Sequence, residues 1–339
     1  MKQLDSLLEG VYKLLSVRKG EISPQEDISE TGANLARFCA GREWLPWGKR
    51  SFSNHRNDFL NTLLDLYRKG EWGINKQTKE GQTLLHLAVL EGKADLIRDL
   101  VNKNALSLPD RFGLTPHHLS RYLGLTNSLT PPPLKKILIY RNKSEKVEPI
   151  SIEEFEERLK IKYTSSLLFP DIKILYKTAK RCARKMKRPH LSQMNHWTLA
   201  LYEKGMDVPR ENLVYIRWIN RYLGYGVFAA CDIPALTFIG EYTGEVQKRN
   251  NRKDRFNDYV FSYDLCGKST RYSINARHRG NFTRFLNHSD TPNLTSRWVI
   301  KDGITHVILF SNRLIRKGSQ LTYCYGPWYW RSRSTPSPL

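Results

Sequence analysis

An irregular polar segment near the C-terminus, RGNFTRFLNHSDTPNL at residues 279–294, constrains the fold more than any other stretch of the chain. No helix or strand period accounts for it, and its apolar residues Phe282, Phe285 and Leu286 are interrupted by polar ones. The closing Asp-Thr-Pro-Asn predicts a turn, because proline fixes φ and Asn and Asp bond their own backbone. The pattern predicts a buried loop that binds a ligand. A polar loop that only caps a strand is the alternative that these residues leave open.

The chain around this segment, from about Leu213 onward, consists of short apolar or alternating runs separated by Gly, Pro and Asn. They predict a β-rich domain of small sheets without the strand–helix alternation of a parallel α/β sheet. Helices are predicted before this domain. A capping box at residues 151–154 starts one helix, and two more follow near 171–187 and 191–204. The predicted fold class is α+β with several domains.

Residues 56–125 contain an internal repeat. GQTLLHLA begins at Gly81 and GLTPHHLS begins 32 residues later at Gly113. The period and the pattern resemble ankyrin repeats. The resemblance implies that Thr83 and Thr115 cap the first helix of each repeat and that a glycine follows it, at 92 and at 124. It also implies a surface for a protein partner that the sequence does not identify.

The patterns together predict six segments. They are an N-terminal helical segment (1–55), ankyrin-like repeats (56–125), a linker (126–150), a helical region (151–210), a β-rich domain (211–330) and a disordered tail (331–339). The linker is predicted from three consecutive prolines at 131–133 and the charged residues that follow them.

The net charge of +22 favours acidic partners such as nucleic acid, nucleosomes or an anionic surface. Basic residues are concentrated between Lys177 and Arg188. This run predicts either a nuclear-localisation or nucleic-acid contact, or a solvated helix face, and the sequence leaves both interpretations open.

The cysteine and histidine spacings indicate no metal site. The five cysteines are far apart, which suggests a reducing compartment, and His86, His117 and His118 are interpreted as part of the repeat architecture or its surface. The chain has no run of eighteen apolar residues and no signal-peptide pattern at its start, so no membrane contact is expected.

Four motifs follow one another in the last third of the chain. They are Gly224-Tyr225-Gly226, then GEYTGE at 240–245, then the segment 279–294, then GSQLTYCYG at 318–326. In this order they resemble the SET-domain protein lysine methyltransferases, over Leu213 to Trp330. The order of an ankyrin-like module before the SET domain is shared with some histone methyltransferases of that family.

The resemblance implies a pseudoknotted SET domain, S-adenosylmethionine as methyl donor and no metal. It implies that Tyr325 and Tyr242 are catalytic. It implies cofactor contacts at Leu223, Gly224, Tyr225, Tyr259, Arg284, Phe285, Asn287 and His288. It implies a channel for the substrate lysine lined by Tyr242, Tyr259, Phe261, Tyr323 and Tyr329.

These residue types suit methyl transfer to an amine. The lysine must arrive neutral, against a reference pKa of about 10.4, and an apolar aromatic channel disfavours the ammonium form. A tyrosine hydroxyl, with a reference pKa of about 10, is expected to orient the amine rather than to act as a strong base. Tyr323 stands two residues before Tyr325, where a tyrosine in this family limits methylation, so mono- or dimethylation is expected.

The sequence departs from these relatives in one respect that bears on the channel. Asp290 replaces a zinc-ligating cysteine and the tail lacks cysteines, so the channel must be closed differently, with Trp328, Tyr329 and Trp330 as candidates. The expected substrate is a histone tail or nucleosome, and the expected site of action is the nucleus. Alternatives are a non-histone substrate, an inactive ankyrin and SET scaffold, and a bacterial protein delivered into a host nucleus.

Overall fold

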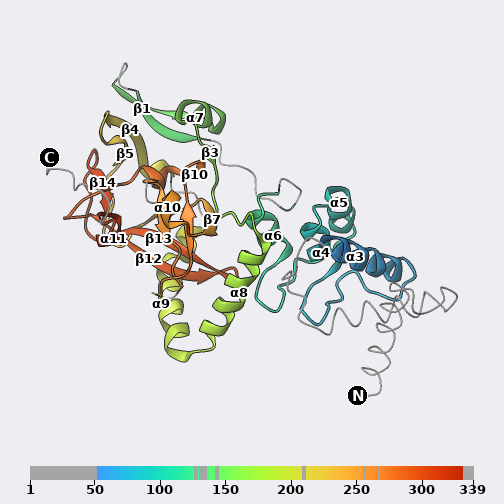
Figure 1. The fold of residues 1–339 in the computed structure, drawn as a ribbon. Helices are drawn as coiled ribbons and strands as arrows, with labels where there is room; N and C mark the ends of the chain where they lie inside the picture. The colour runs from blue at the N-terminus through green and yellow to red at the C-terminus, as the bar shows by residue number, and fades with distance from the viewer. Residues whose placement is uncertain are drawn as a thin grey trace. The chain divides into compact units, whose positions relative to one another are not determined.

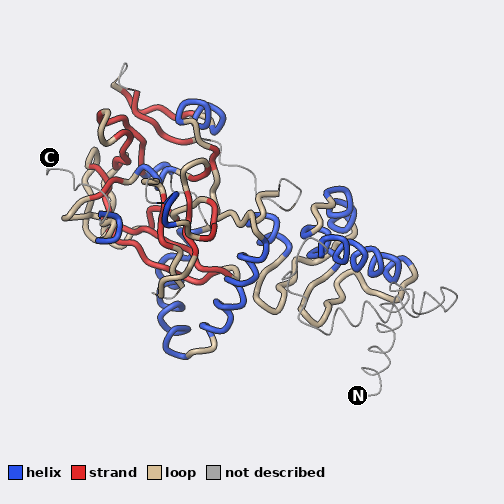
Figure 2. Tube along the Cα trace, viewed as in Figure 1, coloured by secondary structure: helices blue, strands red, loops and turns tan. Residues whose placement is uncertain are grey.

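The computed structural model describes residues 52–125, 129, 136–141, 145–207, 211–254, 257–265 and 268–330. The chain forms two compact units, residues 1–130 with 175–180 and residues 131–174 with 181–339. Figure 2 shows strands within the second unit, whereas the described part of the first contains helices and loops. The segment predicted over 1–55, apart from its last four residues, and the predicted tail lie outside the described residues.

The first unit contains four short helices between residues 52 and 122 (Figure 1). They are α3 (Phe52–Arg68), α4 (Leu84–Leu90), α5 (Ala94–Asn102) and α6 (Pro116–Tyr122). Thr83 and Thr115 occupy the N-caps of α4 and α6, as predicted, and the Thr115 hydroxyl accepts a hydrogen bond from the backbone N–H of His118. The assignment of this unit to ankyrin repeats remains a prediction.

The two copies of the internal repeat are joined through their loops and through one buried histidine. The backbone N–H of Arg111 donates to the Glu80 carbonyl at 3.0 Å. The ring of His86 is fully buried, accepts a hydrogen bond at Nδ1 from the backbone N–H of Thr83 (3.0 Å) and donates from Nε2 to the Leu114 carbonyl (3.0 Å). This arrangement requires the neutral ring. Its burial lowers the pKa of His86 from its ordinary value of 6.5 to about 4.

The His86→Asn variant should be less stable than the wild type, and the difference should shrink on acidification. Between pH 6.5 and about 4 the unfolded chain binds a proton at His86 that the folded chain does not, so the stability contributed by His86 is lost as pH falls through this window. The full effect is about 3 kcal/mol. Urea denaturation of both proteins from pH 4.5 to 7.5 measures it, with the exposed His278→Asn as control. A difference that is independent of pH would contradict this account.

The largest sheet of the second unit has six strands in the order β11-β14-β5-β4-β1-β2. Neighbours are antiparallel except for β11 with β14 and β4 with β1, which are parallel. The strands span Ile137–Arg141 (β1), Lys146–Ile150 (β2), Val214–Asn220 (β4), Gly224–Ala229 (β5), Asn287–His288 (β11) and Gln320–Tyr323 (β14).

The hairpin of β1 and β2 differs from the linker predicted over 126–150. Ile137 and Ile139 are buried on one face of β1, and Ile139 pairs with Ile216 of β4, so the hairpin extends the sheet. The prolines and charges of this range conceal a strand alternation only five residues long. The linker interpretation therefore does not hold for residues 137–141 and 145–150.

Three smaller sheets complete the second unit. Their strands are β3 (Lys162–Tyr163) with β10 (Arg279–Gly280); β12 (Leu294–Lys301), β13 (Ile304–Ser311) and β6 (Phe238–Glu241); and β7 (Glu245–Lys248), β9 (Tyr272–Asn275) and β8 (Val260–Ser262). Its α-helices are α7 (Ile152–Leu159), α8 (Ile172–Met186), α9 (Pro189–Met206), α10 (Asn251–Asp254) and α11 (Pro327–Trp330), and its 3₁₀ turns are η1 (Glu211–Leu213) and η2 (Phe282–Phe285). Residues 175–180 of α8 group with the first unit.

Helix α9 covers one face of the β12-β13-β6 sheet. Tyr202 of α9 stacks on Phe310 with ring centroids 4.8 Å apart, within an apolar cluster of the two elements. The buried Asn195 side chain donates to the Ile300 carbonyl (2.8 Å) and accepts from the Ile300 N–H (2.7 Å). These bonds satisfy polar groups that burial would otherwise leave costly. Across the described helices, none is both long and apolar enough to cross a membrane.

Candidate active site

The polar segment at residues 279–294 is a buried and internally bonded loop. Phe282, Phe285 and Leu286 are at most 5% exposed, so the predicted apolar anchors are confirmed. Asn281 caps η2, because its side chain accepts from the Thr283 N–H (3.0 Å) and donates to the Glu241 carbonyl (3.0 Å). The loop is therefore held in place before any ligand binds.

Strand β11 follows this loop and places it beside the C-terminal motif. Asn287 pairs with Thr322, and His288 pairs with Tyr323, in a parallel bridge to β14. Asn293 bonds β14 from the other end of the loop, accepting from the Thr322 N–H (2.9 Å) and donating to the Gln320 carbonyl (2.8 Å). Two motifs separated by 23 residues of the chain, 295–317, thus form one structure.

Tyr325 is bonded to the loop at two points. Its hydroxyl donates to the Leu286 carbonyl at 2.7 Å, and its backbone N–H donates to Nδ1 of His288 at 3.1 Å. Nε2 of His288 lies 3.1 Å from a carboxylate oxygen of Asp290. The half-buried tyrosine ring is thereby fixed at the point where the two motifs meet.

A group of aromatic rings from four elements surrounds Tyr325. The ring centroids are 4.9 Å apart for Tyr242 and Phe261, 5.9 Å for Phe261 and Tyr323, 4.8 Å for Tyr323 and Tyr325, and 4.6 Å for Tyr325 and Tyr329. Burial raises the pKa of the Tyr242, Tyr323 and Tyr325 hydroxyls above its ordinary value. These hydroxyls therefore stay protonated near neutral pH and can donate hydrogen bonds.

Arg284 and Tyr259 form a second contact of the site. The guanidinium carbon of Arg284 lies 3.6 Å from the centroid of the Tyr259 ring, and its Nε donates to the Ala276 carbonyl at 2.8 Å. Arg284 is only 8% exposed, and its burial lowers the pKa of the guanidinium. The cation is stabilised by the ring face and by the carbonyl instead of by water.

The predicted glycine motif lies beside the same loop. The Asn220 side chain accepts from the Leu223 N–H at 2.9 Å, and Gly224 follows with φ of +67°, a conformation that favours glycine. Tyr225 packs edge-on against Phe285 with centroids 5.7 Å apart, and its carbonyl accepts from the Asn287 side chain at 3.3 Å. The glycine motif and the loop therefore share contacts.

The structure connects the predicted site residues through one continuous set of ring contacts and hydrogen bonds. Leu223 and Gly224 are the exceptions, because they are connected to this set through the backbone turn that precedes Tyr225. Two further residues belong to it. Trp330, predicted only as part of a closing segment, packs edge-on against His288 at 4.9 Å, and Asp258 accepts from the Tyr329 hydroxyl at 3.0 Å. No sequence signal marks Asp258, because it lies in a polar stretch with no motif. In the described ranges no three His, Cys, Asp or Glu side chains are arranged to hold a metal ion.

Comparison with known proteins identifies this region. Residues 224–326 match the SET domain family. MEDEA, a histone-lysine N-methyltransferase of Arabidopsis thaliana, is 36% identical over 139 residues, covering 38% of this chain and 20% of its own. Human EHMT1, of the same class, is 37% identical over 116 residues, covering 33% of this chain and 9% of its own. The matched region spans less than a third of the length of these relatives.

Among solved structures, Arabidopsis thaliana SUVH6 in complex with S-adenosylmethionine is 30% identical, with a TM-score of 0.30, covering 33% of this chain and 28% of its own. The SET domain of this chain is thus a β-rich domain with histone-lysine methyltransferase relatives. The pseudoknot remains a prediction.

The Gly240→Ala substitution should destabilise the loop at 279–294. A Cβ at this position would lie 2.9 Å from Cζ of Phe282 and 3.0 Å from Cγ2 of Thr283, both buried. Overpacking of this kind costs roughly 1–3 kcal/mol. Urea denaturation measures the loss, with Gly73→Ala as control, because its nearest contact is 3.9 Å away. Equal stability of the Gly240→Ala variant and the wild type would show that the loop is not tightly packed.

Proposed function

We propose that the chain is an S-adenosylmethionine-dependent protein lysine N-methyltransferase that acts on histone tails. The observation that carries the proposal is the position of Tyr325, bonded to Leu286 and His288 and enclosed by aromatic rings. The match of residues 224–326 to the SET domain and the names of the relatives support it. The nucleus is the proposed place of action.

The methyl donor would bind against the glycine motif and the loop. Gly224 has only Cζ3 of Trp218, at 4.0 Å, near the place of a Cβ, so this side of the turn has room for a ligand. The ring faces of Tyr225 and Phe285, together with Asn287, offer apolar and polar contacts to an adenosine group. The other contacts proposed are Leu223, Tyr259, Arg284 and His288. When bound, S-adenosylmethionine supplies a methyl group on a positively charged sulfur.

The substrate lysine would enter between the aromatic rings. A channel lined by Tyr242, Tyr259, Phe261, Tyr323 and Tyr329 excludes water and disfavours the ammonium form, so the amine enters neutral. The Tyr325 hydroxyl donates its single proton to the Leu286 carbonyl, so its oxygen is left to accept a hydrogen bond from an N–H of the neutral amine and thereby to orient the amine at the end of the channel. Tyr329, bonded to Asp258, and Trp330 would close the channel.

Tyr325→Phe should lower the rate of methyl transfer by roughly 100-fold or more, because it removes one preorganised hydroxyl from the reacting centre. Binding of S-adenosylmethionine should be retained. Transfer of labelled methyl to mixed histones and to recombinant nucleosomes measures the rate, with Tyr67→Phe as the matched control. If the wild type binds S-adenosylmethionine but labels no histone, the substrate is to be sought among non-histone proteins.

If the wild type does not bind S-adenosylmethionine, the result favours the alternative of an inactive scaffold.

Tyr323→Phe should shift the product toward higher methylation. Tyr323 is 9% exposed and stacks on Phe261, so removal of its hydroxyl opens space inside the aromatic group. The wild type should give mono- and dimethyl-lysine, and the variant should give a larger trimethyl fraction. Mass spectrometry of a modified histone peptide distinguishes them. Mainly trimethyl-lysine from the wild type would refute the product assignment.

A further inference from the structure

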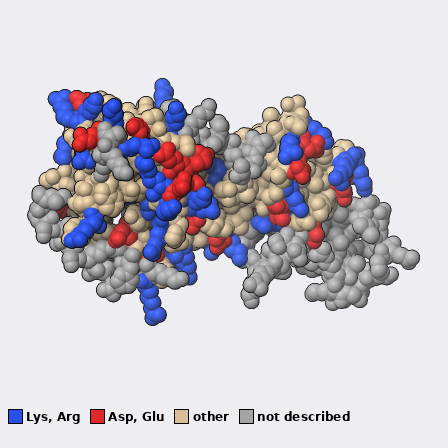
Figure 3. Space-filling model, turned by 90° about the horizontal axis from the view of Figure 1, so that it is seen from above, with Lys and Arg blue, Asp and Glu red and all other residues tan. Residues whose placement is uncertain are grey.

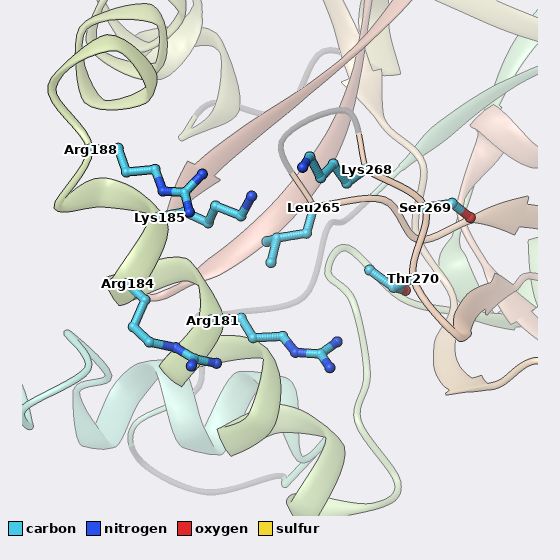
Figure 4. Close-up of a pocket in the computed structure, with 8 residues that line it drawn as sticks. All are labelled: Arg181, Arg184, Lys185, Arg188, Leu265, Lys268, Ser269 and Thr270. Carbon is cyan, nitrogen blue, oxygen red and sulfur yellow. The ribbon is translucent and has the colours of Figure 1, made fainter.

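One hollow of the second unit is lined mainly by positively charged side chains. It has a volume of about 410 Å³. Its lining residues are Arg181, Arg184, Lys185, Arg188, Leu265, Lys268, Ser269 and Thr270. Figure 4 shows Arg181 and Lys185 extending from α8 toward the loop that carries Leu265 and Lys268. We call it the basic pocket.

The four cations from the α8 segment occupy one helix face. Arg181, Arg184, Lys185 and Arg188 have the spacing i, i+3, i+4 and i+7, which places them in a single row. At about 1.5 Å of rise per residue the row is roughly 10 Å long. Arg188 stands at the junction with α9, as its N-cap residue.

The opposite wall of the basic pocket is held in place by packing. Leu265 is 6% exposed and packs with Cys182, Ile300 and Met186. Leu265 and Lys268 exchange backbone hydrogen bonds of 2.9 and 3.1 Å, and the Thr270 hydroxyl donates to the Tyr263 carbonyl at 2.5 Å. The described residues of this wall are therefore held in place by contacts within the fold.

The five cations of the basic pocket have no counter-charge in the described part of the chain. None of their side chains forms an ion pair or a hydrogen bond with another described residue, and no Asp or Glu lines the hollow. On the face drawn in Figure 3, acidic side chains are grouped among basic ones. Like charges held this close repel one another, so an anion that binds here is favoured.

We propose that the basic pocket binds the phosphate backbone of double-stranded DNA without reading its sequence. DNA presents a phosphate about every 3.4 Å of helix axis on each strand, so the row of about 10 Å spans roughly three phosphates of one strand. Arginine donors match phosphate oxygens in pairs, and the hydroxyl of Ser269 is of the kind that donates to phosphates.

An acidic protein is a weaker match for this surface. The core of a protein–protein interface is apolar, whereas among the described lining residues only Leu265 is apolar, and it is already buried against α8. Interfaces with DNA are polar and strongly positive. The proposal goes beyond methyl transfer and does not depend on it, because DNA binding is measured without S-adenosylmethionine or histone.

The test is fluorescence anisotropy with two unrelated DNA duplexes of about 20 base pairs, at salt concentrations from about 50 to 200 mM. The variant replaces Arg181, Arg184, Lys185, Arg188 and Lys268 with Gln. The wild type should bind both duplexes alike. The variant should bind roughly tenfold or more weakly, and its slope of log affinity against log salt should be shallower by about 3 to 4.5, since each lost phosphate contact removes about 0.9 and the five cations contact roughly three to five phosphates.

The matched control removes the same charge from exposed positions of the same unit that lie outside the basic run, with Gln at Lys136, Lys146, Lys204, Lys248 and Lys317. Retained methyl transfer to a free histone peptide, or an unchanged circular dichroism spectrum if the chain proves inactive, shows that the pocket variant folds. Equal losses in both variants would overturn the proposal in favour of diffuse charge. Equally tight binding to polyglutamate would overturn it in favour of an acidic protein, and absence of DNA binding by the wild type would overturn it outright.

Discussion

The parallel pairing of β11 with β14 is the contact on which the candidate active site depends. It has only two residue pairs, Asn287 with Thr322 and His288 with Tyr323. Two strands so short have little stability of their own, and parallel pairs need a long connection between them. Here the connection is stabilised by Asn293, whose side chain forms hydrogen bonds with the backbone of both Gln320 and Thr322 in β14. Asn281 stabilises the start of the loop through its hydrogen bond to the Glu241 carbonyl. Hydrogen bonds from the side-chain amides of Asn281 and Asn293 thus supply stability that longer strands would obtain from additional backbone hydrogen bonds.

The same constraint explains the environment of the tyrosines. Because β11 and β14 meet at the edge of the six-stranded sheet, the chain beyond Tyr323 leaves the sheet and Tyr325 turns back to bond the Leu286 carbonyl. The rings of Tyr323 from β14 and of Tyr329 and Trp330 from α11 then pack against it, and Phe261 and Tyr242 extend the aromatic group beyond Tyr323. Burial raises the pKa of the Tyr323 and Tyr325 hydroxyls, which keeps them neutral, while the cation of Arg284 lies against the ring of Tyr259. The site is therefore aromatic, with the charge of Arg284 against one of its rings.

Much of this could be predicted from the sequence, because the site residues lie in short motifs whose order is distinctive. The helix caps at Thr115 and Ser151 could also be predicted, because a helix cap is encoded by residues adjacent in the sequence. The β1–β2 hairpin was not, because its partner β4 follows more than sixty residues later and prolines mask its alternation. Asp258 and Asn195 were missed for the same reason. Each acts through a contact more than seventy residues away in the chain, with no repeated spacing to reveal it.

The support of the site comes largely from residues that precede the matched family region. The Thr243 hydroxyl donates to the Thr164 carbonyl at 2.9 Å, and the backbone of Leu168 exchanges bonds with Gly244 and Val246 at 2.9 and 2.7 Å. Phe155 of α7 packs edge-on against Phe285. Buried polar groups left without these partners would each cost about 1–3 kcal/mol. Residues 145–174, predicted as the end of a linker and the start of a separate helical region, are therefore integral to the β-rich domain, and the boundary of this domain lies well before residue 211.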